Sequence, residues 1–483
     1  MTVKLNFKKE PFEHQKKALV NSYERQEFGY FMEMGTGKSK VLLDDMALLF
    51  LQQKINFALI IAPKGVYRNW IDKEIPEHMS EDIPHRTISW VAAPNKKQQA
   101  EMQSVKNPFN GLTVFVMNVE AFSTAKGRAA GLWFAAQLGE QGLIAVDEST
   151  TIKNHKAKRT KSLLKISEHF RYRRLLTGSP ITKSPMDIFS QSEFLRPGLL
   201  GHESFYTFQA RYAVMHRRTT GSHAFNQIVG FKNLDELTDK IDMFSYRVLK
   251  KDCLDLPDKV YTARYVTLTD EQFKMYRSLK EEALILLDNY QMVTAPAVIT
   301  QMLRIQQVLS GHLKTDDGEM KYFPTRRLDA LLEILEEHNG KAIIWSRFRH
   351  DIKSIVDALG SSAAAYYGDT ADNERSSIVK RFQAPDSSLK YFVGNPATAG
   401  YGLTLTEANL VVYYANDFNL ETRIQSEDRC HRIGQKNNVT YVDLISEGTI
   451  DEKIVTSLRN KINLSAKVLG EQAKEWLTLT PKK

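Results

Sequence analysis

The chain has 483 residues, of which 42% are hydrophobic and 25% are charged. At about 150 residues per domain, this length predicts roughly three domains or one large bilobed enzyme. The 66 Lys and Arg residues exceed the 57 Asp and Glu residues, so the formal net charge is +9 and a polyanionic partner is favoured. The composition excludes a small module and an intrinsically disordered chain.

The two cysteines, Cys253 and Cys430, lie far apart in the sequence. They exclude a disulfide framework or a cysteine-built metal site as the organising principle. The amino terminus has no apolar core of the signal-peptide type, and no apolar run is long enough to span a bilayer. We therefore expect a soluble protein with no membrane partner, located in the cytoplasm, or in the host cytoplasm if the protein is viral.

The first part of the chain alternates between strand-like and helical patterns. Short aliphatic runs that end in Gly, Pro, Asp, Asn or Ser are typical of buried parallel strands. They read FALIIAPKG from Phe57, GLTVFVMN from Gly111, GLIAVDES from Gly142 and YRRLLTGSP from Tyr172. The segment from Val41 places Leu42, Met46 and Leu49 on one helical stripe. These patterns predict a first α/β lobe over residues 1–197.

The last part of the chain repeats this plan and predicts a second α/β lobe over residues 324–483. A helix is expected from Arg327, where Leu328, Leu331, Leu332 and Leu335 follow helical spacing. Its strands are expected in KAIIWSRF, AAAYYGD, KYFVGN, NLVVYYAND and VTYVDLIS, which begin at 341, 363, 390, 409 and 439. Residues 198–323 lack this alternation and carry a helical pattern from Glu271, so we interpret them as helical insertions and an inter-lobe hinge.

The segment MEMGTGKSK follows the strand-like FGYFM and precedes a helix. Glycines at such a junction let backbone N–H groups surround phosphate oxygens, and the helix N-terminus favours negative charge. This predicts an ATP site at Met34, Gly35, Thr36, Gly37, Lys38 and Ser39. Lys38 would reach the β and γ phosphates and Ser39 would ligate Mg²⁺. Met32 replaces the first glycine of the usual pattern, and the alternative is an ordinary strand-to-helix turn.

The segment IAVDEST places two carboxylates at the end of an apolar strand, where α/β folds hold their ligands. Asp147 is expected to hold Mg²⁺, and Glu148 is expected to orient and deprotonate the attacking water. The alternative is a solvated acidic turn. The order of Lys38, Ser39 and this acidic pair along the chain favours the catalytic interpretation.

Arg429 and Arg432 lie three residues apart in QSEDRCHRIGQ, a spacing that places them on one face of a helix. Two guanidinium groups so placed can stabilise charge on a transferred phosphate as an arginine finger. A salt-bridged surface helix or a phosphate-backbone contact is the alternative. The neighbouring Cys430 and His431 are expected to pack, as are Trp70, Trp345, Phe348 and Tyr414, which lie in or beside strands.

Together these motifs resemble those of the superfamily 2 helicase-like ATPases, and most closely the SWI/SNF branch of DNA translocases in its compact phage or bacterial form. The fragments GTGKS, DEST, LLTGSP, RVLKKDCLDLPDK, ATAGYGLTLTEAN and HRIGQ carry the resemblance over nearly the whole chain. It implies two RecA-like parallel-sheet lobes, with ATP and Mg²⁺ as cofactors.

The resemblance also implies roles for residues that no local pattern identifies. Gln15 would read adenine, Gln425 and Gly402 would contribute to the ATP site, and Thr177 with Gly178 would couple hydrolysis to movement. Nucleic-acid contacts are implied at Lys64, Asn118, Ser346, Arg347 and Thr398. Two departures stand out: Thr150 replaces a His that usually links the γ-phosphate to the LLTGSP motif, and Phe418, Asn419 and Leu420 replace Trp-Asn-Pro.

The resemblance therefore implies an ATP-dependent motor that moves along double-stranded DNA and remodels protein-DNA complexes or recombination intermediates. One alternative is a strand-separating helicase on DNA or RNA, which would need a wedge element that the sequence does not reveal. Another is a nucleotide-gated DNA-binding module with little turnover. The basic clusters His155 to Lys161 and His216 to Arg218 could hold phosphates, but such runs are more often solvated faces, so they are not assigned as sites.

Overall fold

The computed structural model describes residues 5–64, 66–220, 223–253, 256–288, 295–315, 317–399 and 403–468. The chain divides into two compact units. The first comprises Met1–Val214, Gly230–Asp255 and Leu464–Gln472, and the second comprises Met215–Val229, Leu256–Asn463 and Ala473–Lys483. No helix within the described ranges has the length and apolar character needed to cross a membrane.

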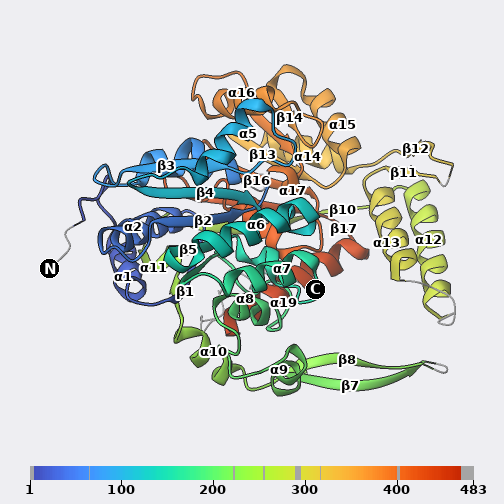
Figure 1. Ribbon diagram of the computed structural model, residues 1–483. Coiled ribbons are helices and arrows are strands. Elements are labelled where there is room, and N and C mark those ends of the chain that lie inside the picture. Colours follow the sequence, from blue (N-terminus) through green and yellow to red (C-terminus); the bar gives the residue numbers. More distant parts are fainter. Residues whose placement is uncertain are drawn as a thin grey trace. The chain divides into compact units, whose positions relative to one another are not determined.

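The first unit is built on a seven-stranded sheet in the order β3-β4-β2-β5-β6-β1-β9 (Figure 1). All neighbouring strands are parallel. Their bounds are β1 Glu27–Met32, β2 Phe57–Ala62, β3 His85–Ser89, β4 Leu112–Asn118, β5 Gly142–Asp147, β6 Tyr172–Leu176 and β9 Ser245–Val248. The strands predicted at β2, β4, β5 and β6 are confirmed, and their continuous burial follows because helices cover both faces.

Helices connect these strands. They are α1 Glu13–Ser22, α2 Lys38–Leu51, α3 Tyr67–Asn69, α4 Ile75–His78, α5 Lys96–Gln103, α6 Ala125–Leu138, α7 Lys158–Ser167, α8 Asp187–Leu195, α9 Phe205–Tyr212, α10 Leu234–Asp242 and α11 Lys250–Cys253. Three short turns matter for the site: the π-helical turn η1 Trp70–Glu74, and the 3₁₀ turns η3 Val119–Ser123 and η5 Ser149–Ile152. The predicted stripe of α2, Leu42, Met46 and Leu49, is fully buried in the core.

A buried ion pair fixes α2 against this sheet. Arg174 on β6 donates from Nε to Asp45 Oδ2 on α2 at 2.8 Å, and the hydroxyl of Tyr30 on β1 donates to the same oxygen at 3.0 Å. Arg174 and Asp45 are both completely buried. Burial of a charge is tolerated only when it is paired and hydrogen-bonded, so this contact specifies how α2 is oriented on β1 and β6.

The second unit contains a six-stranded parallel sheet in the order β10-β17-β16-β13-β15-β14. The strands are β10 Lys259–Val266, β13 Lys341–Ser346, β14 Ala363–Tyr366, β15 Tyr391–Gly394, β16 Ala408–Ala415 and β17 Val439–Ser446. Its helices include α14 Arg327–Glu336, α15 Arg349–Leu359, α16 Asp372–Gln383, α17 Pro396–Ala399, α18 Leu420–Glu427 and α19 Ile450–Val468. Ile344 and Val412 enter one core cluster while Ile343 and Val411 enter another, so successive side chains fill opposite faces of the sheet. Two α/β lobes on parallel sheets confirm the predicted fold class.

Residues 198–323, interpreted from the sequence as helical insertions and an inter-lobe hinge, contain strands as well as helices. The segment does contain α12 Asp270–Asp288 and α13 Ala295–Leu309, which pack on each other, and a small sheet of β11 His312–Lys314 and β12 Met320–Tyr322. It also contains the two-stranded hairpin β7 Ala213–Thr220 and β8 His223–Phe231, and the edge strands β9 and β10. The division into two units given above falls at other positions than the expected boundaries at 197 and 323, which stay a prediction. Edge strands such as β10 alternate between exposed and less exposed residues, so they lack the buried apolar run that marks a central strand.

The side chains expected to pack are in the interior. Trp70, Trp345, Phe348 and Tyr414 are all buried. Cys430 is buried, and its thiol donates to the Ala408 carbonyl at 2.7 Å. These observations confirm a packing role for the aromatic residues and for this cysteine.

A buried charge network holds α18 in the second lobe. The guanidinium of Arg423 contacts Asp443 Oδ1 on β17 at 2.5 Å and Glu427 Oε1 at 2.9 Å. Glu427 Oε2 accepts from the Tyr261 hydroxyl at 2.7 Å and from Lys259 Nζ at 3.2 Å, both on β10. Burial raises the pKa of Glu427, but Lys259 and Arg423 outweigh burial and lower that pKa to about 2.

The variant Glu427→Gln is expected to lose about 3 kcal/mol of unfolding free energy at pH 7, because it leaves Lys259 and Arg423 without their charged partner. The pKa of Glu427 is lowered on folding, so its contribution is present above about pH 4.5 and disappears as the pH falls toward about 2. Urea denaturation at several pH values measures both effects. Glu336→Gln, at an exposed position of α14, is the control, and equal stability of the two variants would contradict the prediction.

Candidate active site

The loop between β1 and α2 has the geometry of a phosphate cradle. Gly35 and Gly37 adopt φ values of 81° and 90°, which L side chains rarely adopt. A Cβ on Gly37 would lie 2.1 Å from Gln15 Nε2, so this position also lacks room for a side chain. The loop leads into the N-terminus of the 14-residue helix α2, where backbone N–H groups and the helix dipole favour an anion.

Gln15 lies beside this loop. Its side chain donates from Nε2 to the Thr36 carbonyl at 3.0 Å, and its Oε1 accepts from the Phe12 N–H at 3.0 Å. His14, which sequence reasoning did not single out, also contacts the Thr36 carbonyl through Nε2 at 2.8 Å. The start of α1 is thereby attached to the phosphate loop.

Lys38 is buried, and its ammonium group lies at the end of β1. Nζ donates to the Met32 carbonyl at 2.9 Å and to the Glu33 carbonyl at 3.4 Å. Backbone carbonyls are neutral partners, so a phosphate oxygen would be a stronger acceptor for the same ammonium group. The side chain is therefore held inside the loop, where the predicted role requires it.

Asp147 ends β5, and Glu148 follows it. Asp147 Oδ2 accepts from Trp70 Nε1 at 3.0 Å, and Oδ1 accepts from the Glu148 N–H at 3.0 Å. Burial raises the pKa of Asp147, and the positive charge of Lys38 offsets only part of that rise. Glu148 adopts a left-handed conformation with φ 48° and ψ 61°, a strained state that is found most often at functional sites.

Glu74, in the π-helical turn η1, is a carboxylate that sequence reasoning missed. Burial raises its pKa, a hydrogen bond from Ser39 lowers it, and the negative charge of Asp147 raises it again. Glu74 therefore lies near both Ser39 and Asp147.

This oxygen-rich set fits Mg²⁺. Within the described ranges no group of three or more His, Cys, Asp or Glu residues forms a metal cage. Mg²⁺ does not need one, because it is usually bound by one or two carboxylates together with substrate phosphates and water. Ser39 and Asp147 are the residues that would hold the ion beside the phosphates, with Glu74 in contact with Ser39.

The LLTGSP turn lies against the phosphate loop. The Thr177 N–H donates to the Tyr30 carbonyl at 3.2 Å. A Cβ on Gly178 would lie 3.2 Å from the Met34 nitrogen and 3.4 Å from the Glu33 Cα. Glycine permits this close approach, so the predicted coupling residues are positioned to respond to the loop.

Thr150 does not interrupt the connection between the acidic motif and this turn. Ser149 donates from its hydroxyl to Gln191 Oε1 at 2.6 Å, and Gln191 Nε2 donates to the Pro180 carbonyl at 2.7 Å. Lys153 Nζ donates to the Thr182 hydroxyl at 2.6 Å. One polar link therefore joins the acidic motif to the LLTGSP segment without a histidine, and a second reaches Thr182, two residues beyond it.

The segment 245–250, at the edge of the sheet, also contacts the phosphate loop. Sequence reasoning did not predict these contacts. Arg247 donates from Nη1 to the Phe31 carbonyl at 3.0 Å and to the Gly178 carbonyl at 2.8 Å. The Lys250 N–H donates to Glu33 Oε2 at 2.8 Å, and the Glu33 N–H donates to the Val248 carbonyl at 3.0 Å. One short segment thus contacts both the phosphate loop and the coupling turn.

Arg429 and Arg432 meet in the second lobe, although not on one helix as expected. Helix α18 ends at Glu427, whose carbonyl accepts the N–H groups of Cys430 and His431 as the chain turns. Arg432 Nη1 still donates to the Leu403 carbonyl at 3.0 Å, and Arg429 Nη1 approaches the same oxygen at 3.5 Å. Arg429 Nε also donates to the carbonyl of Gln425, which is itself buried. Gly402 lies outside the described residues.

The predicted nucleic-acid contacts of the first lobe follow neighbouring strands. Ala62 on β2 pairs with Asn118 on β4, and the exposed Lys64 lies two residues beyond β2. The Lys64 N–H donates to Glu120 Oε2 at 3.0 Å, and Asn118 Oδ1 accepts from the Ala121 N–H at 2.9 Å. The fold therefore brings these two candidates to one edge.

The second-lobe candidates differ among themselves. Arg347 donates to Gln306 Oε1 at 2.8 Å, and Asn395, three residues before the half-buried Thr398, donates to the Arg347 carbonyl at 2.9 Å. The structure therefore brings Arg347 close to the loop of Thr398. Ser346, in contrast, is fully buried and donates to Asp351 at 2.6 Å, so its side chain does not support a direct nucleic-acid contact.

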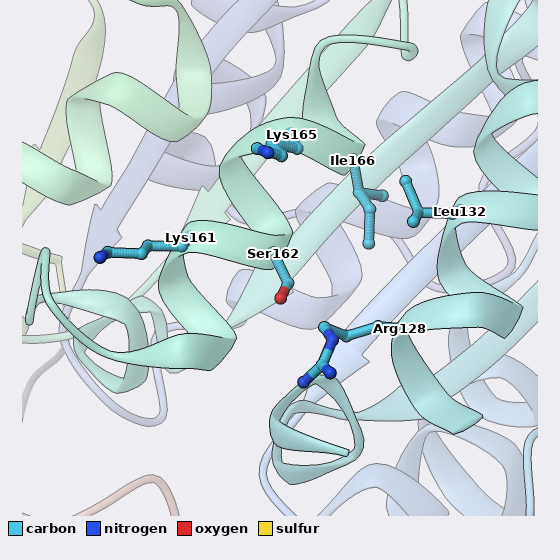
Figure 2. A pocket seen from close by; sticks show the side chains of 6 residues that line it. All are labelled: Arg128, Leu132, Lys161, Ser162, Lys165 and Ile166. Carbon is cyan, nitrogen blue, oxygen red and sulfur yellow. The ribbon is translucent and has the colours of Figure 1, made fainter. Parts of the chain in front are cut away.

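A groove of about 290 Å³ lies between α6 and α7 of the first lobe (Figure 2). Its residues are far from the phosphate loop along the chain. Its lining residues are Arg128, Leu132, Lys161, Ser162, Lys165 and Ile166. Leu132 and Ile166 lie side by side in it, while Lys161 extends away from them. None of the predicted catalytic residues lines this groove.

Comparison with known proteins agrees with the motifs and the two lobes. The SNF2-related domain family matches residues 14–314, and the helicase conserved C-terminal domain matches residues 326–434. Because the first match covers more than half of the chain, this protein belongs to the SNF2-related family, the SWI/SNF branch of the superfamily 2 helicase-like ATPases. The resemblance inferred from the sequence is confirmed.

The chain is similar to an uncharacterized ATP-dependent helicase of Mycoplasma pneumoniae, with 24% identity over 95% of this chain and 42% of that protein. It is also 24% identical to the transcription regulatory protein SNF2 of Saccharomyces cerevisiae over 90% of this chain and 26% of that protein. It thus spans less than half of these relatives. A solved Sulfolobus solfataricus SWI2/SNF2 ATPase core in complex with double-stranded DNA is 24% identical, with a TM-score of 0.43, over 94% of this chain and 92% of that chain.

Arg247→Ala is expected to weaken ATP binding about tenfold, because the loss of a charged donor to two carbonyls costs about 1.4 kcal/mol or more. Isothermal titration calorimetry with ATP and Mg²⁺ measures the change. Arg381→Ala, at an exposed position of α16, serves as the control. An unchanged affinity in Arg247→Ala would show that these contacts do not hold the phosphate loop in its binding conformation.

Proposed function

We propose that this chain is a Mg²⁺-dependent ATPase that moves along double-stranded DNA and remodels protein-DNA complexes or recombination intermediates. The observation that carries the proposal is the convergence of Lys38, Asp147 and Glu148 at one edge of the first sheet. Asp147 lies near enough to Lys38 for its pKa to respond to the ammonium charge. Membership of the SWI/SNF branch supports the identity of the reaction and of the DNA track.

In the first lobe each residue has a separable task. The phosphate loop and Lys38 bind the β and γ phosphates, and Gln15 contacts the adenine. Ser39 and Asp147 hold Mg²⁺, which supplies charge neutralisation at the phosphates when it is bound. Glu148 orients the attacking water and accepts its proton. The strained backbone of Glu148 supports this role, because such a conformation persists only where surrounding contacts enforce it.

The second lobe would supply Arg429 and Arg432 as arginine fingers. Both guanidinium groups are held near the Leu403 carbonyl, and α18 is fixed by its own buried ion pairs. Hydrolysis would then require closure of the two lobes on ATP, which couples turnover to movement. Gln425 and Gly402 would complete the nucleotide site from this side, and Thr177 with Gly178 would transmit the state of the phosphate loop.

The DNA contacts would be largely independent of sequence. The net charge of +9 and the exposed Lys64 support binding to phosphates, which is electrostatic and sensitive to salt. Asn118, Arg347 and Thr398 would add polar contacts from the ends of neighbouring strands. A strand-separating helicase and a gated binding module with little turnover remain the alternatives that the following measurement distinguishes.

Steady-state ATP hydrolysis, measured without nucleic acid and then with duplex DNA, single-stranded DNA or RNA at one low salt concentration, tests the proposal. Strong stimulation by duplex DNA is expected, and displacement of a triplex-forming strand would then report translocation. Preferential stimulation by single strands or RNA would support the helicase instead. The absence of turnover with every nucleic acid would support the binding module.

Glu148→Gln is expected to reduce ATP turnover by about 10²- to 10⁴-fold, because it removes the general base. Binding of ATP and of duplex DNA should change little, since the amide keeps the size of the carboxylate. Turnover, nucleotide titration and DNA anisotropy measure the three properties. The same substitution at the exposed Glu101 of α5 is the control, and undiminished turnover in Glu148→Gln would remove this residue from its assigned role.

A further inference from the structure

The hairpin of β7 and β8 forms a two-stranded sheet of its own. Its two strands pair only with each other among the strands of the described chain (Figure 1). From Val214 to Arg217 every residue is exposed, so both faces of this part of β7 meet solvent. An isolated two-stranded hairpin is only marginally stable in water, which indicates that a partner covers it.

The base of the hairpin is nevertheless firmly attached. Tyr212, at the end of α9, donates to Glu236 Oε1 on α10 at 2.9 Å, and Lys240 contacts Glu236 at 3.0 Å and the Tyr212 hydroxyl at 3.1 Å. Arg211 also pairs with Glu236. Hydrogen bonds from Arg211, Lys240 and Tyr212 lower the pKa of Glu236 to about 2. A fixed base and an exposed arm are the features of a ribbon that is held out toward a ligand.

The charge of this region identifies the class of ligand. Residues 204–234 contain four Lys and Arg residues and no Asp or Glu. Arg211 is committed to Glu236, but Arg217 is exposed and forms no hydrogen bond or ion pair in the described part of the chain. An uncompensated positive ribbon of this kind complements a polyanion.

The shape of the ribbon favours duplex DNA over other polyanions. The major groove of B-DNA is wide enough to admit a two-stranded β-ribbon. Val214, Met215 and Val229 are 41%, 36% and 54% exposed, so the ribbon also offers apolar contacts to the groove. A flat phosphate surface alone would leave these apolar side chains in water.

We propose that the β7–β8 hairpin inserts into a groove of duplex DNA as a second DNA contact, separate from the loops at the ends of the parallel strands. The exposed Arg217 contacts a phosphate and the neighbouring Arg218 adds positive charge to the ribbon, while Met215 and Val229 contact the apolar edges of the groove. This inference rests on the proposed function, since it assumes that the motor follows duplex DNA. It assigns His216 to Arg218, which the sequence left as a solvated face, to a binding surface.

The test uses the full chain with Arg217→Gln and Arg218→Gln combined, against the wild type. Anisotropy of a labelled blunt duplex is measured without nucleotide from about 50 to about 200 mM salt. Loss of the Arg217 phosphate contact should reduce the slope of log affinity against log salt by about 0.9 or more and weaken binding several-fold at low salt. Turnover without DNA should be unchanged, and half-maximal stimulation should need more DNA.

Two further variants make the result specific. Lys96→Gln with Lys97→Gln removes the same charge from exposed positions of α5 and should leave the salt slope as in the wild type. Met215→Ser with Val229→Ser should weaken duplex binding without changing the salt slope, because no phosphate contact is lost. Equal melting temperatures for all variants establish that each protein is folded.

The outcomes separate this inference from the proposed function. If the wild type neither binds duplex DNA nor responds to it, the proposed function fails. If the wild type does so and both hairpin variants match it, only the hairpin proposal is overturned. If the hairpin variants lose self-association but bind DNA as the wild type does, the hairpin mediates contacts between copies of the chain. If they lose only strand separation, the hairpin acts as a wedge. Either result also overturns the proposal.

Discussion

The parallel alignment of β6, β1 and β9 is the constraint on which the first half of the active site depends. Tyr30 pairs with Leu176 on one side of β1, and Met32 pairs with Val248 on the other. Because the carboxyl ends of parallel strands meet at one edge, the phosphate loop, the LLTGSP turn and the segment after β9 emerge side by side. Only this order allows one guanidinium, that of Arg247, to bond carbonyls of both β1 and the turn after β6.

The contacts at this edge explain how the site tolerates costly features. A buried ammonium group, a half-buried carboxylate and a strained backbone each oppose folding when taken alone. Here Lys38 bonds two carbonyls, Asp147 accepts two N–H groups, and the left-handed Glu148 donates one of them. The buried core and the ion pair between Arg174 and Asp45 stabilise the lobe. This stability offsets the unfavourable free energy of the site.

The sequence was sufficient where one local property determines the outcome. Continuous apolar runs identified the central strands, and the glycines and Lys38 identified the phosphate loop, because burial and positive φ leave a signature in the residues themselves. The hairpin and the short edge strand β9 left no such signature. Glu74 and Arg247 could not be found either, since their importance lies in contacts with residues far away in the chain. The end of α18 was missed for the same reason: the Glu427 carbonyl is satisfied by the turn that follows and by Tyr441.

Each half of the proposed site is stabilised within its own lobe. The phosphate loop is held by α1, by the LLTGSP turn and by the segment of Arg247, whereas α18 is held by Arg423, Asp443 and residues of β10. Preorganised groups need little rearrangement when the reaction begins. Under the proposed function, ATP binding would therefore only have to bring the two preorganised halves of the site together. This division suits a motor, because the binding energy of ATP is then available for lobe movement and is not consumed in folding either half of the site.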